Sequence, residues 1–401
     1  MSTAQSTVHP QLKNRAWLTL FVLCISGSLL MGGIYVCLGV YTSFIEAADG
    51  WSTAELNECL TVFLVAMSIF NIASGYLSEK TSPKMTILVG ALLSAAGCYF
   101  ASISASQQAF TLAIAVLGAG VGMGAFVPSI TLITDQFAER QGLALGIFFA
   151  SISIFSGLSP QILAEIIGRW GWRTSFEISA VCILLASSLI LILPRQTSVE
   201  PDAKSEHVAE RSLVSLVLNK RFMILTLIMT VSAITVNGVL FGSVEYLVAG
   251  GIALPSAVAI FGYSNLVSTI GYFVAGILAD RSGPKPLLPI ALLMQAVGVA
   301  SLLVVFDANW SWIATVVYVV VWGLSIGVPS QLLPMVLLEG TPASSFPFLL
   351  GISTAVSSLV SSFAPAINGW AVQASGGSTF SLLSVVIATA TMVPAILLLR
   401  K

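Results

Sequence analysis

Two glutamates that enter long apolar segments are the clearest candidates for proton chemistry in this sequence. Glu58 lies nearly two turns inside one such segment, and Glu165 lies near the end of another. A carboxyl group held partly out of water can take up and release a proton near neutral pH. We therefore expect Glu58, and after it Glu165, to carry a coupling proton. The alternative is that the acids at this depth only pair with nearby arginines (Glu165, Glu177, Arg169 and Arg173).

Four prolines form a second group of candidate residues, because each interrupts a long apolar segment (Pro128, Pro160, Pro329 and Pro365). A proline has no N–H group, so the carbonyl four residues earlier loses its helical hydrogen bond. Inside a membrane that carbonyl needs water, a hydroxyl group or a ligand as its partner. Two interpretations stay open. The freed carbonyls contact a ligand, or neighbouring serines and threonines satisfy them and the prolines only shape the helices.

The segments that hold these residues have the composition of membrane spans. Hydrophobic residues make up 57% of the chain and charged residues 8%, against roughly 45–50% and 25% in soluble domains. Apolar runs of roughly 20 residues, the length that crosses a bilayer as a helix, recur about twelve times. Strands of a membrane barrel would be about ten residues long with alternating polarity, so the sequence predicts an all-α integral membrane protein. The predicted spans are residues 16–44, 53–77, 85–105, 109–134, 141–167, 175–194, 221–247, 254–279, 286–306, 311–337, 345–370 and 378–399.

The sequence repeats itself, which divides the spans into two sets of six. The segment Gly75–Lys84 (GYLSEKTSPK) returns 201 positions later as Gly276–Lys285 (GILADRSGPK), and Val127–Ser129 returns as Val328–Ser330. Matched helix breaks in the two halves of a membrane protein indicate a transport site between them. We predict twelve transmembrane helices in two pseudo-symmetric six-helix bundles. The predicted divisions are a tail (1–15), a first bundle (16–194), a polar linker (195–220) and a second bundle (221–401).

The basic residues predict how the spans are oriented. If the N-terminus is cytoplasmic, 14 of the 16 Lys and Arg residues fall on the cytoplasmic side, and only Arg169 and Arg173 fall outside. Cytoplasmic loops carry such an excess of basic residues. We therefore expect a multi-pass protein of the bacterial inner membrane with both termini in the cytoplasm, as an even number of spans requires.

Several classes of protein are disfavoured by the sequence. The five cysteines lie in or beside apolar runs without metal-ligand spacing, so neither a metal site nor structural disulfides are expected. A net charge of −1 gives no basic field for a nucleic acid. No nucleophile, metal or paired-acid cluster indicates an enzyme, and we expect no cofactor. The expected partners are the lipid bilayer, a small-molecule substrate and a proton, with the monomer as the functional unit.

The repeated loop segment resembles the loop signature of the major facilitator superfamily. In both copies a glycine, an acid, a base, a proline and a lysine follow in the same order, after spans two and eight. The resemblance implies a gate, in which the acid meets the positive end of a neighbouring helix and the base pairs with an acid such as Asp135. The alternative is that these charges only mark the membrane surface. The expected gating residues are Glu79, Lys84, Asp135, Asp280, Arg281 and Lys285.

The same resemblance implies that spans 1, 4, 7 and 10 line a central cavity and that spans 2, 5, 8 and 11 flank it. Polar residues deep in these spans are then candidates to bind substrate, because polar groups are costly in hydrocarbon and tend to face the interior. Asn265 and Tyr272 of span 8 share one helix face, although hydrogen bonding between helices without a ligand explains them equally well. The substrate-binding candidates are Tyr35, Ser129, Asn237, Phe241, Asn265, Tyr272, Trp322 and Gln331.

The first half further resembles the monocarboxylate transporter family and its bacterial relatives, including oxalate and formate exchangers. The residues that carry this resemblance are Phe137–Ile147, Pro160 and Gly171–Arg173. It implies transport of a small organic acid with a proton by alternating access. The sequence departs from the family pattern at Tyr272 and Val36, where members can carry Arg and Lys, and no Lys or Arg lies near the middle of a span. The alternatives are a proton-coupled exporter of drugs or other neutral or aromatic molecules, and a non-transporting membrane sensor.

Overall fold

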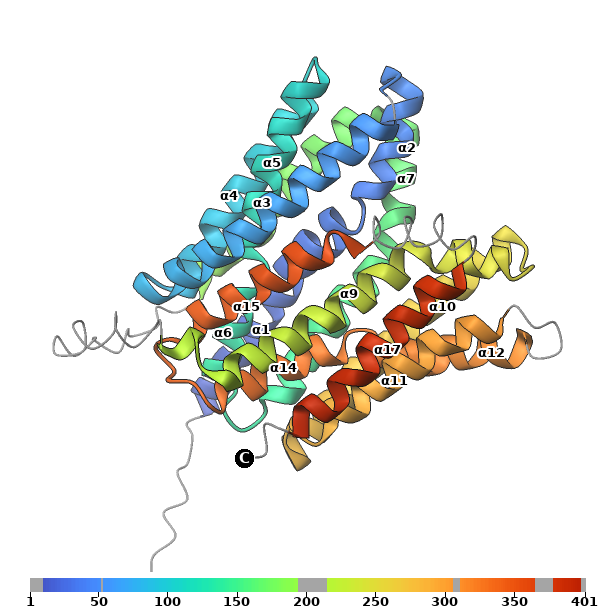
Figure 1. Ribbon diagram of the computed structural model, residues 1–401. Helices are drawn as coiled ribbons and strands as arrows, with labels where there is room; N and C mark the ends of the chain where they lie inside the picture. Colours follow the sequence, from blue (N-terminus) through green and yellow to red (C-terminus); the bar gives the residue numbers. More distant parts are fainter. Residues whose placement is uncertain (1–9, 52, 194–214, 306–310, 365–377, 398–401) are drawn as a thin grey trace, which may run out of the picture.

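The computed structural model of the chain describes residues 10–51, 53–193, 215–305, 311–364 and 378–397. Every regular element in these residues is a helix, as the long apolar runs predict. Among them, nine helical segments are long and apolar enough to cross a bilayer by themselves. One of the nine contains two spans and shorter helices supply the rest, so the chain has twelve spans, six in each half (Figure 1).

The first half builds six spans between Pro10 and Ile192. Its fifth and sixth spans form one continuous helical segment, in which the backbone turns at Gly171 (φ 82°, ψ 161°). Glycine is the residue that adopts this backbone conformation without strain, so the turn depends on Gly171. The elements are α1 (Pro10–Gly27), η1 (Ser28–Tyr35) and α2 (Leu38–Asp49) for span 1, then α3 (Thr53–Lys80), α4 (Pro83–Ser102), α5 (Gln107–Gly124) with α6 (Val127–Gln136) for span 4, and α7 (Gln141–Ser188) with η2 (Leu189–Ile192).

The second half repeats this plan. Its elements are α9 (Lys220–Ala249), α10 (Leu254–Ser282), α11 (Leu287–Val304), the four pieces of span 10, namely α12 (Ser311–Val317), η3 (Tyr318–Trp322), α13 (Gly323–Ser325) and α14 (Val328–Leu338), and then α15 (Phe346–Ser361) and α17 (Ser378–Leu397). α1 begins and α17 ends at the same end of the bundle (Figure 1). Residues 195–214 of the predicted linker and residues 1–9 of the predicted tail lie outside the described residues.

Two of the predicted helix breaks divide spans 4 and 10. Pro128 stands in the first turn of α6 and Pro329 in the first turn of α14, so each proline begins a new helix. Pro160 instead lies inside α7, which continues past it, and Pro365 lies outside the described residues. Two π-helices, η1 and η3, accompany the breaks of spans 1 and 10. No pattern in the sequence predicts these π-helices.

A buried glutamine satisfies the carbonyls at the break in span 10. Gln295 of α11 donates from Nε2 to the carbonyl oxygens of Ser325 at 3.2 Å and Ile326 at 2.9 Å. Its Oε1 accepts a hydrogen bond from the Ser232 hydroxyl at 3.1 Å. The partner of the Ser325 carbonyl is thus a glutamine of another span, rather than a neighbouring serine or threonine.

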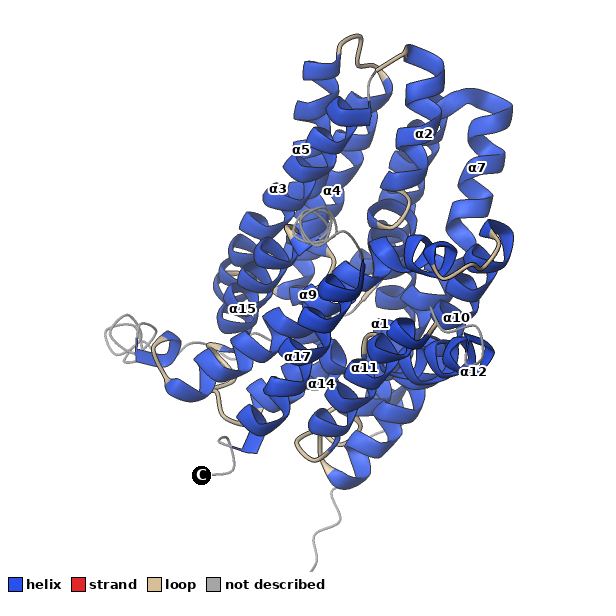
Figure 2. Cartoon of the chain, turned by 45° about the vertical axis from the view of Figure 1, so that its right-hand side comes forward, coloured by secondary structure: helices blue, strands red, loops and turns tan. Residues whose placement is uncertain are grey.

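The two halves meet along two seams that start at the same end of the bundle. α3 packs against α15 in one seam, and α7 packs against α10 in the other. We call the end that carries Lys80, Arg140 and Arg281 the basic end, and the opposite end the far end. Towards the far end the halves diverge: α2 and α5 reach the top of Figure 1 while α12 reaches its right side, and Figure 2 shows the same divergence after a 45° turn.

Within the second half, a ladder of hydrogen bonds joins α15 to α9. Its three steps are Thr226 to Ser353 at 3.1 Å, Thr230 to Ser357 at 3.2 Å and Asn237 to Ser361 at 3.0 Å. Each step joins a polar side chain of α9 to a serine of α15, and the serines stand four residues apart on one helix face. We call these residues the α9–α15 ladder. It fixes α15 to its own half, although α15 also faces α3 of the other half.

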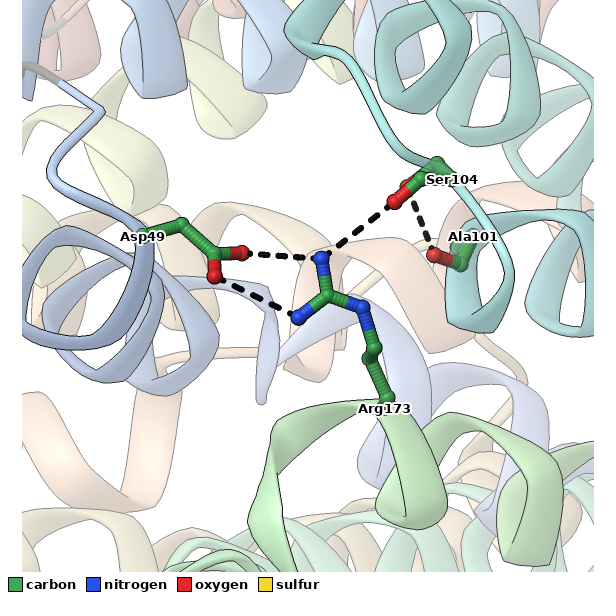
Figure 3. Close-up of polar contacts among 4 residues, drawn as sticks. All are labelled: Asp49, Ala101, Ser104 and Arg173. Atoms are coloured by element: carbon green, nitrogen blue, oxygen red, sulfur yellow. Dashed lines mark hydrogen bonds and ion pairs between the residues drawn. The ribbon is translucent and has the colours of Figure 1, made fainter.

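An arginine closes the far end of the first half. Arg173, just after the turn at Gly171, pairs with Asp49 at the end of α2 at 3.1 Å and donates to the carbonyl oxygen of Ser104 at 3.3 Å (Figure 3). Its guanidinium group also lies 4.1 Å from the centre of the Trp172 ring. Spans 1, 3 and 6 are thereby tied together. The suggested pairing of Arg173 with a glutamate of its own segment is wrong, because Asp49 is the partner.

Candidate functional site

Glycines allow both seams to close tightly at the basic end. A Cβ atom on Gly142 of α7 would collide with the carbonyl oxygen of Gly276 of α10. One on Gly75 of α3 would collide with the carbonyl oxygen of Pro347 of α15. Helix backbones approach this closely where small residues stand at the interface. The glycine that opens each copy of the repeated loop segment therefore lies in a seam between the halves.

Asp280, the acid of the second loop copy, binds the first turn of α7. Its Oδ1 accepts a hydrogen bond from the N–H of Gly142 at 2.6 Å, and its Oδ2 accepts one from the N–H of Leu143 at 2.9 Å. The first N–H groups of a helix have no partner inside it and carry the positive end of its dipole. Asp280 thus supplies two charge-assisted hydrogen bonds across the seam. The predicted contact between this acid and a helix end is present.

The first loop copy lacks the contact that Asp280 makes in the second copy. Its acid, Glu79, is half-buried, and the helix of the other half that packs on α3, α15, has no side-chain cap at its first turn. Asp135 is exposed and belongs to none of the ion pairs among the described residues. The acid–base pair at this end joins Lys285 to Glu339 at 2.7 Å, within the second half. Arg281 is exposed.

Small polar side chains join the halves near the middle of the spans. The hydroxyl oxygen of Ser153 in α7 lies 2.6 Å from that of Ser268 in α10. In the other seam, Ser68 of α3 donates to the hydroxyl of Ser358 in α15 at 3.0 Å. Ser153 stands twelve residues after the start of α7, or about 18 Å along the helix, in a hydrocarbon layer of about 30 Å. Four helices thus place hydroxyl groups at the level where a transport site lies.

The predicted substrate-binding residues fall into different places at this level. Asn265 lies in the α7–α10 seam, where its backbone carbonyl oxygen accepts from the Ser153 hydroxyl at 3.1 Å, while its side-chain amide donates to Phe261 of its own helix at 3.0 Å. Tyr272 stacks on Phe149 of the opposite half, with ring centres 5.4 Å apart. Three other candidates each belong to a single half. Tyr35 stacks on Phe63, and Asn237 belongs to the α9–α15 ladder. Phe241 stands in α9, and its side chain is not among those that the structure describes.

Three of the candidates, Trp322, Ser129 and Gln331, are buried. Of these, Trp322 and Gln331 are held by contacts away from the middle of the interface. Trp322 is 0% exposed, stacks on Tyr318 and packs on Gly298 of α11, so its predicted place in a cavity wall is wrong. Trp322 is the last residue of the π-helix η3. Ser129 is 1% exposed, and its hydroxyl has no hydrogen-bond partner among the described residues. Gln331 belongs to the seam at the basic end, where it donates to Gly142 at 3.1 Å.

Neither predicted proton-coupling residue is buried. Glu58 lies in the second turn of α3 and is exposed, so the premise that it is partly buried is wrong. Glu165 forms an exposed ion pair with Arg169, one helical turn away, at 2.5 Å. The alternative given for Glu165, an ion pair with a nearby arginine, is therefore present.

The α7–α10 pair is less closely packed beyond the middle of the spans than at the basic end. A Cβ atom on Gly157 of α7 would meet only Leu266, at 3.6 Å. A Cβ atom on Gly168, further along α7, or on Gly262 of α10 would have no heavy atom within 4 Å. This agrees with the divergence of the two halves towards the far end (Figure 1). This arrangement is closed at the basic end and open at the far end.

The polar residues of the interface were only partly found from the sequence. Ser153 and Ser358 were missed, because serines occur throughout these spans and none stands next to a charge. Ser358 and Ser361 do lie in a serine-rich stretch just before Pro365, which is the signal that could have indicated them. Gly142 stands within the run that carries the family resemblance. Its contact with Asp280 depends on how α7 packs on α10, which the sequence does not show.

Twelve spans in two similar halves, with a closed seam at one end of a polar interface, define the fold of a membrane transporter. The sequence matches the Major Facilitator Superfamily over residues 16–365. The chain belongs to this superfamily, and it is one of its transporters rather than an enzyme. The expected superfamily resemblance and the all-α, twelve-span fold are confirmed.

Several known proteins are similar to the chain at low identity. Monocarboxylate transporter 6 of Homo sapiens is 22% identical over 400 residues, covering 91% of this chain and 76% of that protein. Multidrug resistance protein MdtL of Shewanella sp. (strain ANA-3) is 30% identical over 180 residues, covering 44% and 45%. The chain spans about half the length of several curated relatives that it matches. A solved transporter of the superfamily, FucP in the outward conformation, shares the fold with a TM-score of 0.77 at 15% identity, covering 96% of this chain and 99% of that one.

Proposed function

We propose that this transporter moves a small organic acid together with a proton across the bacterial inner membrane, by alternating access of a site between its two halves. The observations that support alternating access are the two seams, which glycines close at the basic end with Asp280 across one of them, and the divergence of the halves towards the far end. We take the basic end as cytoplasmic, because cytoplasmic loops carry the excess of Lys and Arg. The structure then corresponds to an outward-open state.

The interface offers hydrogen bonds but no fixed positive charge near its middle. Its polar groups are hydroxyls and amides, among them Ser68, Asn71, Ser153 and Ser358. A bare carboxylate in such a low-dielectric place is costly unless a cation balances it. An acid that travels with a proton is neutral and needs only these donors and acceptors. This is why we favour proton-linked transport of an acid, in line with the similarity to monocarboxylate transporters.

Glu58 is the group that we propose loads the proton. It lies in the second turn of α3, near the far end, and it is exposed. A carboxylate in that place can exchange protons with water on the side to which this state is open. Glu165 is the less favoured candidate, because it already pairs with Arg169 at 2.5 Å.

A second candidate function is proton-coupled export of neutral or aromatic molecules. The same lack of a fixed cation favours it, as does the aromatic ring of Tyr272, which stacks on Phe149 of the opposite half. One curated relative is named as a multidrug resistance protein. This candidate differs from the first in cargo and direction but uses the same gate.

Uptake by purified protein in liposomes separates these functions. With an inward proton gradient, a labelled monocarboxylate should accumulate inside above its outside concentration. Equal uptake with and without the gradient would exclude proton coupling. No uptake across a broad panel of acids, together with proton-driven movement of a cationic or aromatic dye, would establish the exporter instead. A thermal-shift screen against carboxylates, amino acids, sugars and cationic drugs selects the compounds to label.

A further inference from the structure

Gln331 is a buried side chain that reaches across the seam at the basic end. It is 0% exposed and lies in α14, two residues beyond Pro329, where span 10 resumes after its break. Its Nε2 donates to the carbonyl oxygen of Gly142 at 3.1 Å. The N–H of the same Gly142 donates to Asp280 at 2.6 Å. One residue of α7 is thus held at both its N–H and its carbonyl by side chains of the other half, an arrangement that we call the Gly142 clamp.

The clamp needs glycines around the Gln331 amide. A Cβ atom on Gly146 would lie 3.2 Å from its Nε2, and one on Gly276 would lie 3.1 Å from it. The Oε1 of Gln331 is buried and has no hydrogen-bond partner among the described residues. An unpaired buried oxygen costs free energy, and this cost offsets part of what the bond from Nε2 to Gly142 contributes. The closed gate is therefore less stable than it would be if Oε1 also had a partner, which makes the gate easier to open.

The other seam cannot form such a clamp. Gly146 and Gly351 occupy corresponding places in the repeat, so Gly142 of α7 corresponds to Pro347 of α15. A proline has no N–H to give to an acid. The residue that corresponds to Gln331 in the first half, 201 positions earlier, is Ile130, which has no polar side chain. Both parts of the clamp are thus missing from the α3–α15 seam by residue type.

We infer that Gln331 is a positioning residue of the gate, which holds the first turn of α7 from the break in span 10. Because Asp280 binds the same turn, opening of the gate depends on the α7–α10 seam rather than on the α3–α15 seam. The inference rests on the alternating-access function proposed above. Span 10 is broken at the level of the interface, between α13 and α14, and Gln331 follows that break directly. A ligand that moves the start of α14 moves Gln331 away from Gly142 and so loosens α7. Occupation of the site and release of the gate are thereby linked through one side chain.

Hydrogen–deuterium exchange of the purified full-length chain tests this inference. Gln331→Met keeps the length of the side chain and removes its donor, and Gln331→Asn keeps the amide but is one methylene too short to reach Gly142. In both variants, amides in peptides that cover residues 137–150 should exchange about fivefold faster, the effect of losing one net hydrogen bond. Peptides from α11, at Leu287–Val304, serve as the reference for overall stability and should be unchanged.

Ser330→Ala is the matched control, because Ser330 stands beside Gln331 but donates only to Gly327 of its own span at 2.9 Å. It should leave exchange in residues 137–150 at the rate of the unaltered protein. Unchanged exchange in both Gln331 variants would overturn the inference, and so would a rise that α11 shares equally. Exchange is measured without a transported substrate. A failed uptake experiment with intact exchange results would therefore count against the proposed cargo and not against the clamp.

Discussion

Asp280→Asn keeps the size of the side chain and removes its charge, so it isolates the two hydrogen bonds that the carboxylate accepts from the first turn of α7. These bonds, at 2.6 and 2.9 Å, go to a charged acceptor and contribute about 1.5–3 kcal/mol each. The asparagine carbonyl keeps one neutral bond of about 1 kcal/mol. Asp280 is half-exposed, and water weakens such interactions. We therefore expect the closed state to lose about 2–3 kcal/mol, the lower part of this range.

A loss of this size increases the open fraction of the basic-end gate about 30- to 160-fold. The assay is the labelling rate of a reporter cysteine at Ala275, which is 8% exposed and next to Gly276 in the seam. Cys24→Ala and Cys182→Ala remove the two native thiols that are not buried. When opening is rare and fast, the labelling rate follows the open fraction, so it should rise by the same factor.

The matched control is Glu79→Gln in the first loop copy, where α15 offers no capped first turn. It should change the labelling rate by less than about threefold, since an exposed or half-exposed charge without a close partner contributes little. Equal effects of the two substitutions would refute the reasoning, because the gate would then depend on general surface charge. An unchanged rate in Asp280→Asn would show that the hydrogen bonds to α7 do not hold the gate.

Three further substitutions test other parts of the structure. Glu58→Gln should abolish accumulation driven by a proton gradient and preserve exchange of labelled substrate in liposomes, because an amide carries no proton; accumulation that survives would place the coupling group elsewhere. Gln295→Leu leaves the carbonyls at the span-10 break without a donor and should destabilise the protein by about 2 kcal/mol, measured as a lower melting temperature. Its control is Ser301→Ala, which loses a hydrogen bond within its own helix and should lower the melting temperature less. Arg173→Gln breaks the half-exposed pair with Asp49 and should cost no more than about 1 kcal/mol, with a smaller effect at high salt; a loss that salt does not alter would indicate packing on the neighbouring tryptophan instead.

The fold could be predicted because its signals are local and repeated. A membrane span needs only a long apolar run, and the repeat at Gly75 and Gly276 marks the same turn in both halves. Pro128 and Pro329 likewise begin new helices, because a missing N–H acts on the helix in which it stands. The π-helices η1 and η3 have no such local cause in the sequence, so they could not be foreseen.

The sequence predicted several residues of the site, charged and uncharged, but not the partners that most of them meet. Asp280 was found because an acid at a turn has few partners besides a helix end. Ser153 and Ser358 meet residues more than a hundred positions away, and only the relative positions of packed helices select these serines from the many in the spans. Trp322 failed for a related reason: it was chosen for its place in span 10, and a place along a span does not say whether the side chain faces the interface or the core of its own half.

The α9–α15 ladder bears on how α15 can move relative to its two neighbours, α9 and α3. Three hydrogen bonds hold this helix to α9, whereas towards α3 its Ser358 accepts from Ser68 at 3.0 Å and, at the limit of bonding, from Asn71 at 3.5 Å. The ladder therefore assigns α15 to the second half by its hydrogen bonds, whereas close backbone packing on α3 through Gly75 and Gly351 is its main contact with the first half. Movement of α15 relative to α3 breaks few hydrogen bonds, and movement relative to α9 breaks three.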